Sequence, residues 1–177
     1  MKVLLNDRQI ELARELAQKR HEAKDGSFKN SGILTDIKKR TLVEEYIYDR
    51  SHKPHFLGLL GEIAYAAMVG KKIDTKIYSI RDSGFDVGSA EIKTATRIGN
   101  DIELKIKQKE FHTKHPDNYV LVRVNEHYFT RVELIGQISR EDFDKYKTTK
   151  QYGPNNPINY VVGINRLQLF PNEKILL

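Results

Sequence analysis

Two carboxylates and an amine stand close together in the stretch DSGFDVGSAEIKT, which covers residues 82–94. They belong to Asp86, Glu91 and Lys93. Like charges that face each other across a strand pair are destabilising, so such a pair persists where a cation lies between them. The lysine can supply part of that charge, and carboxylate oxygens suit Mg²⁺ or Mn²⁺. The pattern is therefore compatible with a metal site. The alternative is a solvated hairpin whose acids pair with water and with the lysine.

A tight turn would bring these side chains to one face. Gly88 and Ser89 predict a two-residue hairpin loop, and glycine at its first position favours a type II′ turn. Val87 then faces Ala90, and one position further out the two acids face each other. The lysine follows the second acid by two positions and shares its face, because side chains alternate along a strand. Val87, Ala90 and Ile92 would point to the opposite side, into a core.

A third carboxylate, Glu62, is the one charge in the apolar segment FLGLLGEIAYAAMV, residues 56–69. The segment is apolar on nearly all faces, which predicts a buried helix that ends at Gly70. A carboxylate inside such a helix is costly unless it is paired or bound to a metal. Small residues one turn away on either side, Gly58 and Ala66, would let another element approach it. Glu62 is therefore a candidate for the same site, and the alternative is a structural salt bridge to an arginine or lysine.

Helices are predicted before the hairpin and mainly strands after it. Apolar residues recur at helical spacing over about 6–24, where Asn6 or Asp7 could provide the N-cap, and a second helix fits about 34–49. From residue 74 onward the apolar period changes from 3.6 to 2, which indicates strands. Strands are expected at 74–80, 91–98, 101–106, 117–125 and 131–138, with the second and third paired around Gly99 and Asn100, and short helices at 107–115 and 139–147.

This order indicates a mixed α/β fold of α+β type, in which N-terminal helices precede a central mixed sheet flanked by helices. We expect residues 1–54 to form a helical region packed on a core domain of residues 55–177, with the whole chain as one structural domain. Hydrophobic residues make up 39% and charged residues 31%, a balance typical of a globular protein. The chain has no cysteine, which excludes disulfides and thiolate metal sites.

The acid-bearing helix GEIAYAAMVG, followed by GFDV and then by EIKT on a strand, resembles the PD-(D/E)XK nuclease superfamily, which has the restriction-endonuclease-like fold. The resemblance covers about residues 56–135, and the later segments KQKEF, NYVLVRV and VELIGQISREDF are similar to small phage and prokaryotic members. It places the family's metal-binding aspartate at Asp86, its E-x-K element at Glu91 and Lys93, and its helix glutamate at Glu62. The span between the aspartate and the E-x-K acid is shorter than usual, and Asp82 would replace Asp86 in another hairpin register.

The resemblance implies hydrolysis of DNA phosphodiester bonds with Mg²⁺ or Mn²⁺. Asp86 and Glu91 would hold the ion, with the backbone carbonyl of Ile92 as a further ligand. Glu62 would bind a second ion or fix an inner water. Lys93 would orient or deprotonate the attacking water, or stabilise charge in the transition state.

Polar and basic residues that flank the cluster are candidates for contacts with the phosphate backbone of DNA. They are Arg81, Thr94, Thr96, Arg97, Gln108 and Lys109. The net charge of +6 also favours a polyanionic partner such as nucleic acid.

Three functions stay open at this point, and the last of them is a structural or subunit-interface protein whose acidic hairpin is incidental. The first is a metal-dependent endonuclease of phage or restriction type, for which a homodimer is plausible because double-strand cleavage often uses two active sites. The alternative is a non-catalytic module on the same fold that binds nucleic acid or protein. No segment is long and apolar enough for a membrane span, and the N-terminus lacks the apolar core of a signal peptide. We therefore expect the protein in the cytoplasm of a prokaryotic or phage-infected cell.

Overall fold

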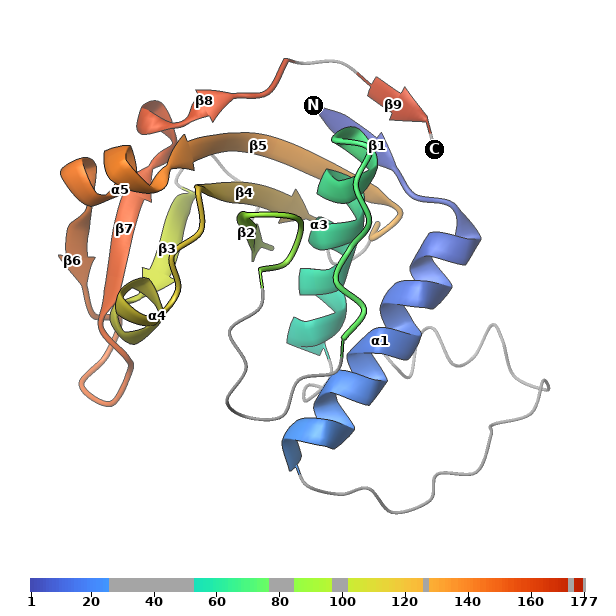
Figure 1. Ribbon diagram of the computed structural model, residues 1–177, viewed down its shortest axis with the longest axis horizontal. Coiled ribbons are helices and arrows are strands. Elements are labelled where there is room, and N and C mark those ends of the chain that lie inside the picture. The colour runs from blue at the N-terminus through green and yellow to red at the C-terminus, as the bar shows by residue number, and fades with distance from the viewer. Residues whose placement is uncertain (26–52, 77–84, 97–101, 126–127, 172–173, 177) are drawn as a thin grey trace.

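The computed structural model describes residues 1–25, 53–76, 85–96, 102–125, 128–171 and 174–176, which form a mixed α/β fold (Figure 1). The helices are α1 (Asp7–Asp25), α3 (Lys53–Met68), α4 (Gln108–Thr113) and α5 (Arg140–Tyr146). The strands are β1 (Lys2–Leu4), β2 (Ala90–Ala95), β3 (Glu103–Lys107), β4 (Asn118–Val124), β5 (Arg131–Ser139), β6 (Thr148–Lys150), β7 (Asn159–Gly163), β8 (Gln168–Leu169) and β9 (Lys174–Leu176). The helix predicted at 34–49 and the candidates Arg81, Asp82 and Arg97 lie outside the described residues. None of the helices described has the length and hydropathy that a membrane crossing needs.

Both long helices lie close to their predicted positions. At the start of α1, the Asn6 side chain accepts a hydrogen bond from the Gln9 N–H (3.0 Å), and the Gln9 side chain accepts one from the Asn6 N–H (2.9 Å). This reciprocal cap satisfies amides that have no partner inside the helix. α3 starts one residue before Pro54, whose fixed φ suits a first helical turn. After α3, Gly70 has a φ of +65° and the next amide bonds back to the Ala66 carbonyl (2.9 Å), which ends the helix.

The strands form two sheets. The larger has the order β2-β4-β5-β1-β9, with β8 paired to β5, and the smaller has the order β3-β7-β6. β2 and β4 are parallel, as are β1 and β9, whereas the remaining pairs are antiparallel. β1 was not predicted, because three residues are too few to show an alternation. It places the N-terminal segment inside the larger sheet, between β5 and β9.

Strand pairing differs from the sequence prediction in one place, and the described part of one predicted strand is irregular. Although Gly99 and Asn100 predict a hairpin, β2 and β3 belong to different sheets, and β3 pairs with β7 over its whole length. A turn signal is local, whereas the partner of a strand is decided by the apolar surface it buries, here around Leu104. Residues 74–76, predicted to begin a strand, are irregular, and the rest of that prediction (77–80) lies outside the described residues.

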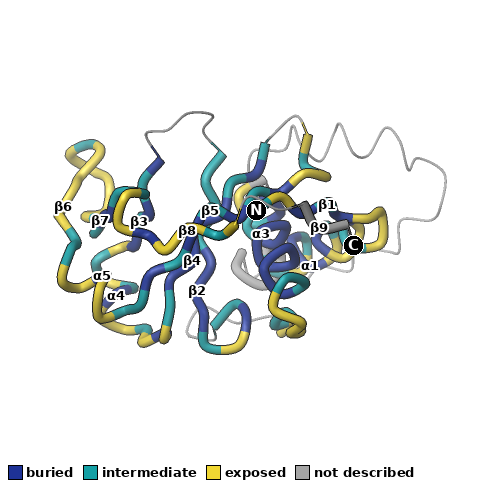
Figure 2. The backbone as a smooth tube through the Cα atoms, turned by 90° about the horizontal axis from the view of Figure 1, so that it is seen from above, coloured by how far each residue is buried: buried dark blue, intermediate teal, exposed yellow. Residues whose placement is uncertain are grey.

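β4 separates two apolar cores, and most of its residues are buried (Figure 2). Val120, Val122 and Val124 face the core that contains α1 and α3, while Tyr119 and Leu121 face the core that contains the smaller sheet, α4 and α5. This is the pattern of a strand covered on both sides. β2 lies beside β4 at the edge of the described larger sheet, so its side chains point alternately toward α3 and toward α4.

Candidate active site

The predicted turn is present at the start of β2. Val87 and Ala90 exchange backbone hydrogen bonds of 3.3 and 3.0 Å, and Gly88 has the positive φ (+59°) that such a turn requires. Val87, Ala90 and Ile92 are all buried in the core around α3, as the alternation predicts. The hairpin therefore fixes the start of β2 and the direction of its side chains.

The antiparallel pairing ends at this bridge and does not extend to Asp86 and Glu91. The chain bends at Asp86, whose Oδ2 accepts a hydrogen bond from the Ile92 N–H (2.7 Å). The prediction that the two acids stand directly opposite each other is therefore wrong in register. Repulsion between two facing carboxylates disfavours that pairing, and the amide on the open edge of β2 offers Asp86 a partner.

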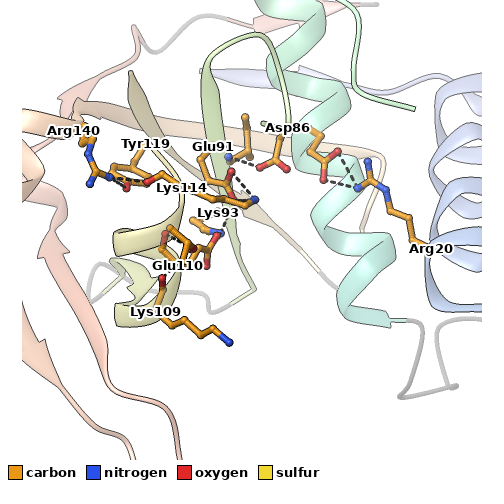
Figure 3. A network of polar contacts seen from close by, with 12 residues as sticks. Arg20, Asp86, Glu91, Lys93, Lys109, Glu110, Lys114, Tyr119 and Arg140 are labelled. Carbon is orange, nitrogen blue, oxygen red and sulfur yellow. Dashed lines mark hydrogen bonds and ion pairs between the residues drawn. The ribbon is translucent and has the colours of Figure 1, made fainter. Parts of the chain in front are cut away.

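Glu91 is held by two ammonium groups, which come from different elements (Figure 3). The Lys93 Nζ lies 2.9 Å from its Oε1, and the Lys114 Nζ lies 3.1 Å from each of its two oxygens. Lys93 also donates to Glu110, which stands on α4. The Glu91 side chain is only 3% exposed. The second strand acid is thus a buried carboxylate with cations on both oxygens.

The acids of the cluster are harder to ionise than free carboxylates. Burial and the charge of Glu62 raise the pKa of Asp86 to about 6, although the bond from Ile92 N–H opposes this. Burial and the charge of Asp86 raise the pKa of Glu91 to about 7, although both lysines oppose this. Such shifts are common at functional sites, where like charges are held together out of water.

Lys93 stays charged in this setting. Burial by itself would lower the pKa of its ammonium, but the carboxylates of Glu91 and Glu110 outweigh burial and raise the pKa above its ordinary value. Lys93 lowers the pKa of the Glu110 carboxyl in return, against the effect of burial.

Glu62 forms a salt bridge with an arginine, which was the sequence-based alternative to a metal site. Its oxygens lie 3.1 and 3.3 Å from the Arg20 Nη1, which α1 carries, and the Arg20 Nη2 donates to the Asp74 carbonyl (2.8 Å). Glu62 is 6% exposed, and burial raises the pKa of its carboxyl even though Arg20 opposes this. The ion pair joins α1 to α3 and to the segment after α3.

Asp86 interacts electrostatically with both Glu62 and Glu91. Glu62 lies on α3, which packs on the face of β2 that carries Ile92, whereas Glu91 points to the opposite face with its register partner Tyr119. Asp86 raises the pKa of Glu91, and Glu62 raises that of Asp86, so the three carboxylates form one electrostatic group around the start of β2.

The donor set suits a hard divalent cation, although the carboxylates do not converge as they lie. Within the described ranges, no group of three aspartate, glutamate or histidine side chains is placed to hold a metal ion. Mg²⁺ usually needs only one or two carboxylates and completes its shell with water and phosphate oxygens. Asp86 and Glu91 meet that need, and their mutual repulsion is what a cation would relieve. The Ile92 carbonyl points to the same edge as its N–H, toward Asp86, because both groups of one strand residue face one side.

A cleft of about 330 Å³ opens beside the amine. Its lining includes Lys93, Thr96, Lys105 and Tyr152. Tyr152 lies in the loop after β6. The Lys105 Nζ lies 4.1 Å from the centre of the Tyr152 ring, and the tyrosine is 48% exposed. The cleft lies between the larger and smaller sheets and offers room for a ligand next to the cluster.

The candidates for phosphate contacts are placed unequally. Thr96 lines the cleft, and Lys109 is exposed and extends away from the acids (Figure 3). Gln108 donates to the Tyr160 hydroxyl (3.0 Å), a contact inside the fold. Thr94 also lines the cleft, but its hydroxyl oxygen is buried near Gly61 of α3, where an added Cβ would lie 2.4 Å from it.

Sequence reasoning did not find three members of this network: Arg20, Glu110 and Lys114. Each is an ordinary charged residue in a charged segment, distant in sequence from its partner. Only the packing of α1 on α3 and of α4 beside β2 reveals them. The periodicity of α4 carries one usable signal, because Glu110 and Lys114 are four positions apart and share a helix face.

Comparisons of the chain with protein-family models, with curated proteins and with solved structures give no match.

Proposed function

We propose that the protein is a metal-dependent endonuclease that hydrolyses DNA phosphodiester bonds, in the manner of the PD-(D/E)XK nucleases that its motifs resemble. The observation that carries the proposal is the cluster of Asp86, Glu91 and Lys93 beside a cleft. A half-buried carboxylate and a buried one, both with raised pKa values, lie with a charged amine at the start of one strand. A non-catalytic surface hairpin would leave these groups in water.

In this proposal Asp86, Glu91 and the Ile92 carbonyl hold Mg²⁺ or Mn²⁺. The bound ion would lower the pKa of a coordinated water and offset charge on the phosphate oxygens. Glu62 is held by Arg20 at the margin of the group, so it would fix an inner water, and would bind a second ion only after leaving Arg20.

Lys93 acts as a cation rather than as a base. Its raised pKa means that the amine holds its proton at neutral pH, so it cannot take one from water. It instead donates hydrogen bonds that orient the attacking water and stabilise charge on the phosphate. In the reaction a water oxygen forms a bond to phosphorus, the bond to the leaving oxygen breaks, and the proton of the water passes to solvent.

The cleft and the basic charge of the chain support a nucleic-acid substrate. The cleft runs from the amine past Thr96 and Lys105 to an exposed aromatic ring, which suits a phosphate with an adjoining base or sugar. A DNA substrate would place the activity in the cytoplasm of a prokaryotic or phage-infected cell. Cleavage of both strands would be served by a homodimer, which brings two such sites together.

The internal ion pairs favour a second candidate, a binding module without catalysis. Both Glu91 oxygens and both Glu62 oxygens already have cationic partners, which is what a purely structural network would show. In that case the fold would bind nucleic acid or protein without cutting.

Cleavage assays separate the two candidates. The protein would be incubated with supercoiled plasmid, branched DNA and single-stranded DNA in Mg²⁺, in Mn²⁺ and in chelator. Asp86→Ala and Lys93→Ala remove one acid and the amine, while Lys145→Ala removes an exposed lysine of α5 as a matched control. We expect wild type and Lys145→Ala to cut in metal, and the two site variants to lose cutting.

Other outcomes of the cleavage assays would contradict the proposed function or favour the second candidate. Cutting that survives chelation, or that survives both site substitutions, would contradict the assignment to this site. DNA binding without cutting under every condition would favour the binding module.

A further inference from the structure

The ammonium of Lys114 lies symmetrically over the Glu91 carboxylate. Its Nζ is 3.1 Å from Oε1 and 3.1 Å from Oε2, and the Glu91 side chain is almost fully buried. A cation equidistant from both oxygens occupies the position from which a carboxylate would bind an ion with both oxygens. Lys93, by contrast, lies on one oxygen only and is shared with Glu110.

The backbone of Lys114 is fixed while its side chain keeps a path to solvent. Its N–H bonds to the Glu110 carbonyl (2.8 Å), and its own carbonyl accepts a hydrogen bond from the Arg140 Nη1 (2.9 Å). The other Arg140 nitrogen holds the Phe111 carbonyl (3.0 Å), so the end of α4 is anchored on α5. The Lys114 side chain is 21% exposed. The amine can therefore swing outward without movement of the helix that carries it.

We propose that Lys114 is a positioning residue that occupies Glu91 in the metal-free protein and gives way to the divalent ion, an exchange that rests on the proposed function. Mg²⁺ binds carboxylate oxygens at about 2.0–2.1 Å. An ammonium over both oxygens leaves no room for that ion, and two cations at such separation repel strongly outside bulk water. Lys93 can stay, because Glu110 holds it independently of Glu91.

The exchange keeps the buried carboxylate compensated in both states. Without metal, the ammonium of Lys114 prevents Glu91 from standing as an unpaired buried charge, which would be strongly destabilising. With metal, the ion compensates the charge of Glu91, and the displaced amine stays at the edge of the site because its backbone does not move. Lys114 therefore sets the apparent metal affinity, because each binding event must first break its contact with Glu91.

Metal binding to the full chain tests the exchange without any reference to cleavage. Mn²⁺ would be titrated into metal-free wild type, Lys114→Met, Lys109→Met and Glu91→Gln, with affinity measured by calorimetry. Lys114→Met and Lys109→Met each remove one positive charge from the same region, but only the first removes the contact with Glu91. We expect Lys114→Met to bind Mn²⁺ about tenfold more tightly than wild type, the effect of about 1.4 kcal/mol, and Lys109→Met to stay within about twofold of wild type, since exposed charges contribute little. Glu91→Gln should weaken binding.

A second measurement uses the wild-type chain and does not depend on the folding of any variant. The reactivity of each lysine toward acetic anhydride, read by mass spectrometry, should rise for Lys114 when Mn²⁺ is added and should not change for Lys109. Unchanged Lys114 reactivity at saturating metal, or equal Mn²⁺ affinities for Lys114→Met and Lys109→Met, would overturn the exchange while leaving the proposed function intact. If Glu91→Gln binds Mn²⁺ as wild type does, the metal is not on Glu91, and both proposals fail.

Discussion

Glu91 is the residue on which the proposed chemistry depends. It lies near the start of β2, nearly without solvent, between the like charge of Asp86 and two ammonium groups. Burial and repulsion favour its neutral form, whereas the lysines favour its charged form. The balance leaves its pKa close to neutrality, so small changes of pH or of bound cation change its charge.

These pKa values predict how stability varies with pH. Asp86 and Glu91 hold their protons in the folded state up to about pH 6 and 7, against ordinary values of 3.8 and 4.5. Between those limits the folded state binds more protons than the unfolded chain, so the free energy of unfolding should fall as pH rises. Urea denaturation of the metal-free protein should therefore show lower stability at pH 8 than at pH 5.

The variant Glu91→Gln is the control for this prediction. It cannot lose a proton at that position, so its stability should vary less between pH 5 and pH 8 than that of wild type. Equal pH dependence in wild type and Glu91→Gln would show that Glu91 does not titrate in this range.

The close approach of α3 to β2 is the element-scale feature that builds the site. Gly61 makes it possible, because a Cβ at that position would lie 2.4 Å from the Thr94 Oγ1 and 3.5 Å from an Ile92 side-chain carbon. Gly61 also precedes Glu62, so this contact sets how near the helix acid comes to the strand acids. At Gly58, one turn earlier, an added Cβ would have no neighbouring atom within 4 Å.

This difference predicts opposite effects for two identical substitutions. Gly61→Ala should lower the free energy of unfolding by about 1–3 kcal/mol, since the added methyl forces the helix from the strand. Gly58→Ala should raise it by about 0.5–1 kcal/mol, because alanine loses less conformational freedom in a helix. Urea denaturation checks both, and Thr94→Ala in the Gly61→Ala background should recover part of the loss. Equal effects at the two glycines would contradict the close contact.

Local features of the sequence predicted both long helices and the strands β2 to β5, but not the partners of those strands. The turn at Gly88, the cap at Asn6 and the end of α3 at Gly70 follow from local conformational preferences, and the structure contains all three. The pairing of β2 with β4 instead of β3 depends on burial across the whole fold. So does the delivery of Lys114 and Arg20 to the two buried glutamates, which no spacing in the sequence encodes.

At the scale of the whole molecule, the site lies where the two apolar cores meet. β4 and β2 separate the core under α1 and α3 from the core under the smaller sheet, and the acidic group straddles the start of β2 between them. The chain has a net charge of +6, and Arg20, Lys93 and Lys114 largely offset the acids of the site, so the excess positive charge lies outside the site. That distribution favours approach of a polyanion to a site that itself needs a cation.

DNA binding should therefore depend strongly on salt. Binding of a labelled duplex in chelator, followed by fluorescence anisotropy, should weaken by about tenfold or more between about 50 and 200 mM salt, because neutralised phosphates release counterions. An affinity that does not change with salt would argue against contacts with the phosphate backbone.

The most direct test of the central claim is the rate of Mg²⁺-dependent nicking of supercoiled plasmid, compared between wild type and three variants. Glu91→Gln and Lys93→Arg change the proposed site, and Glu141→Gln makes the same change as the first at an exposed position of α5. We expect Glu141→Gln to nick as wild type does and Glu91→Gln to lose at least about a hundredfold in rate. Lys93→Arg should lose a similar amount, because a planar guanidinium cannot replace a compact ammonium at a single water. Nicking by Glu91→Gln or by Lys93→Arg at the wild-type rate would show that these residues do not carry the reaction.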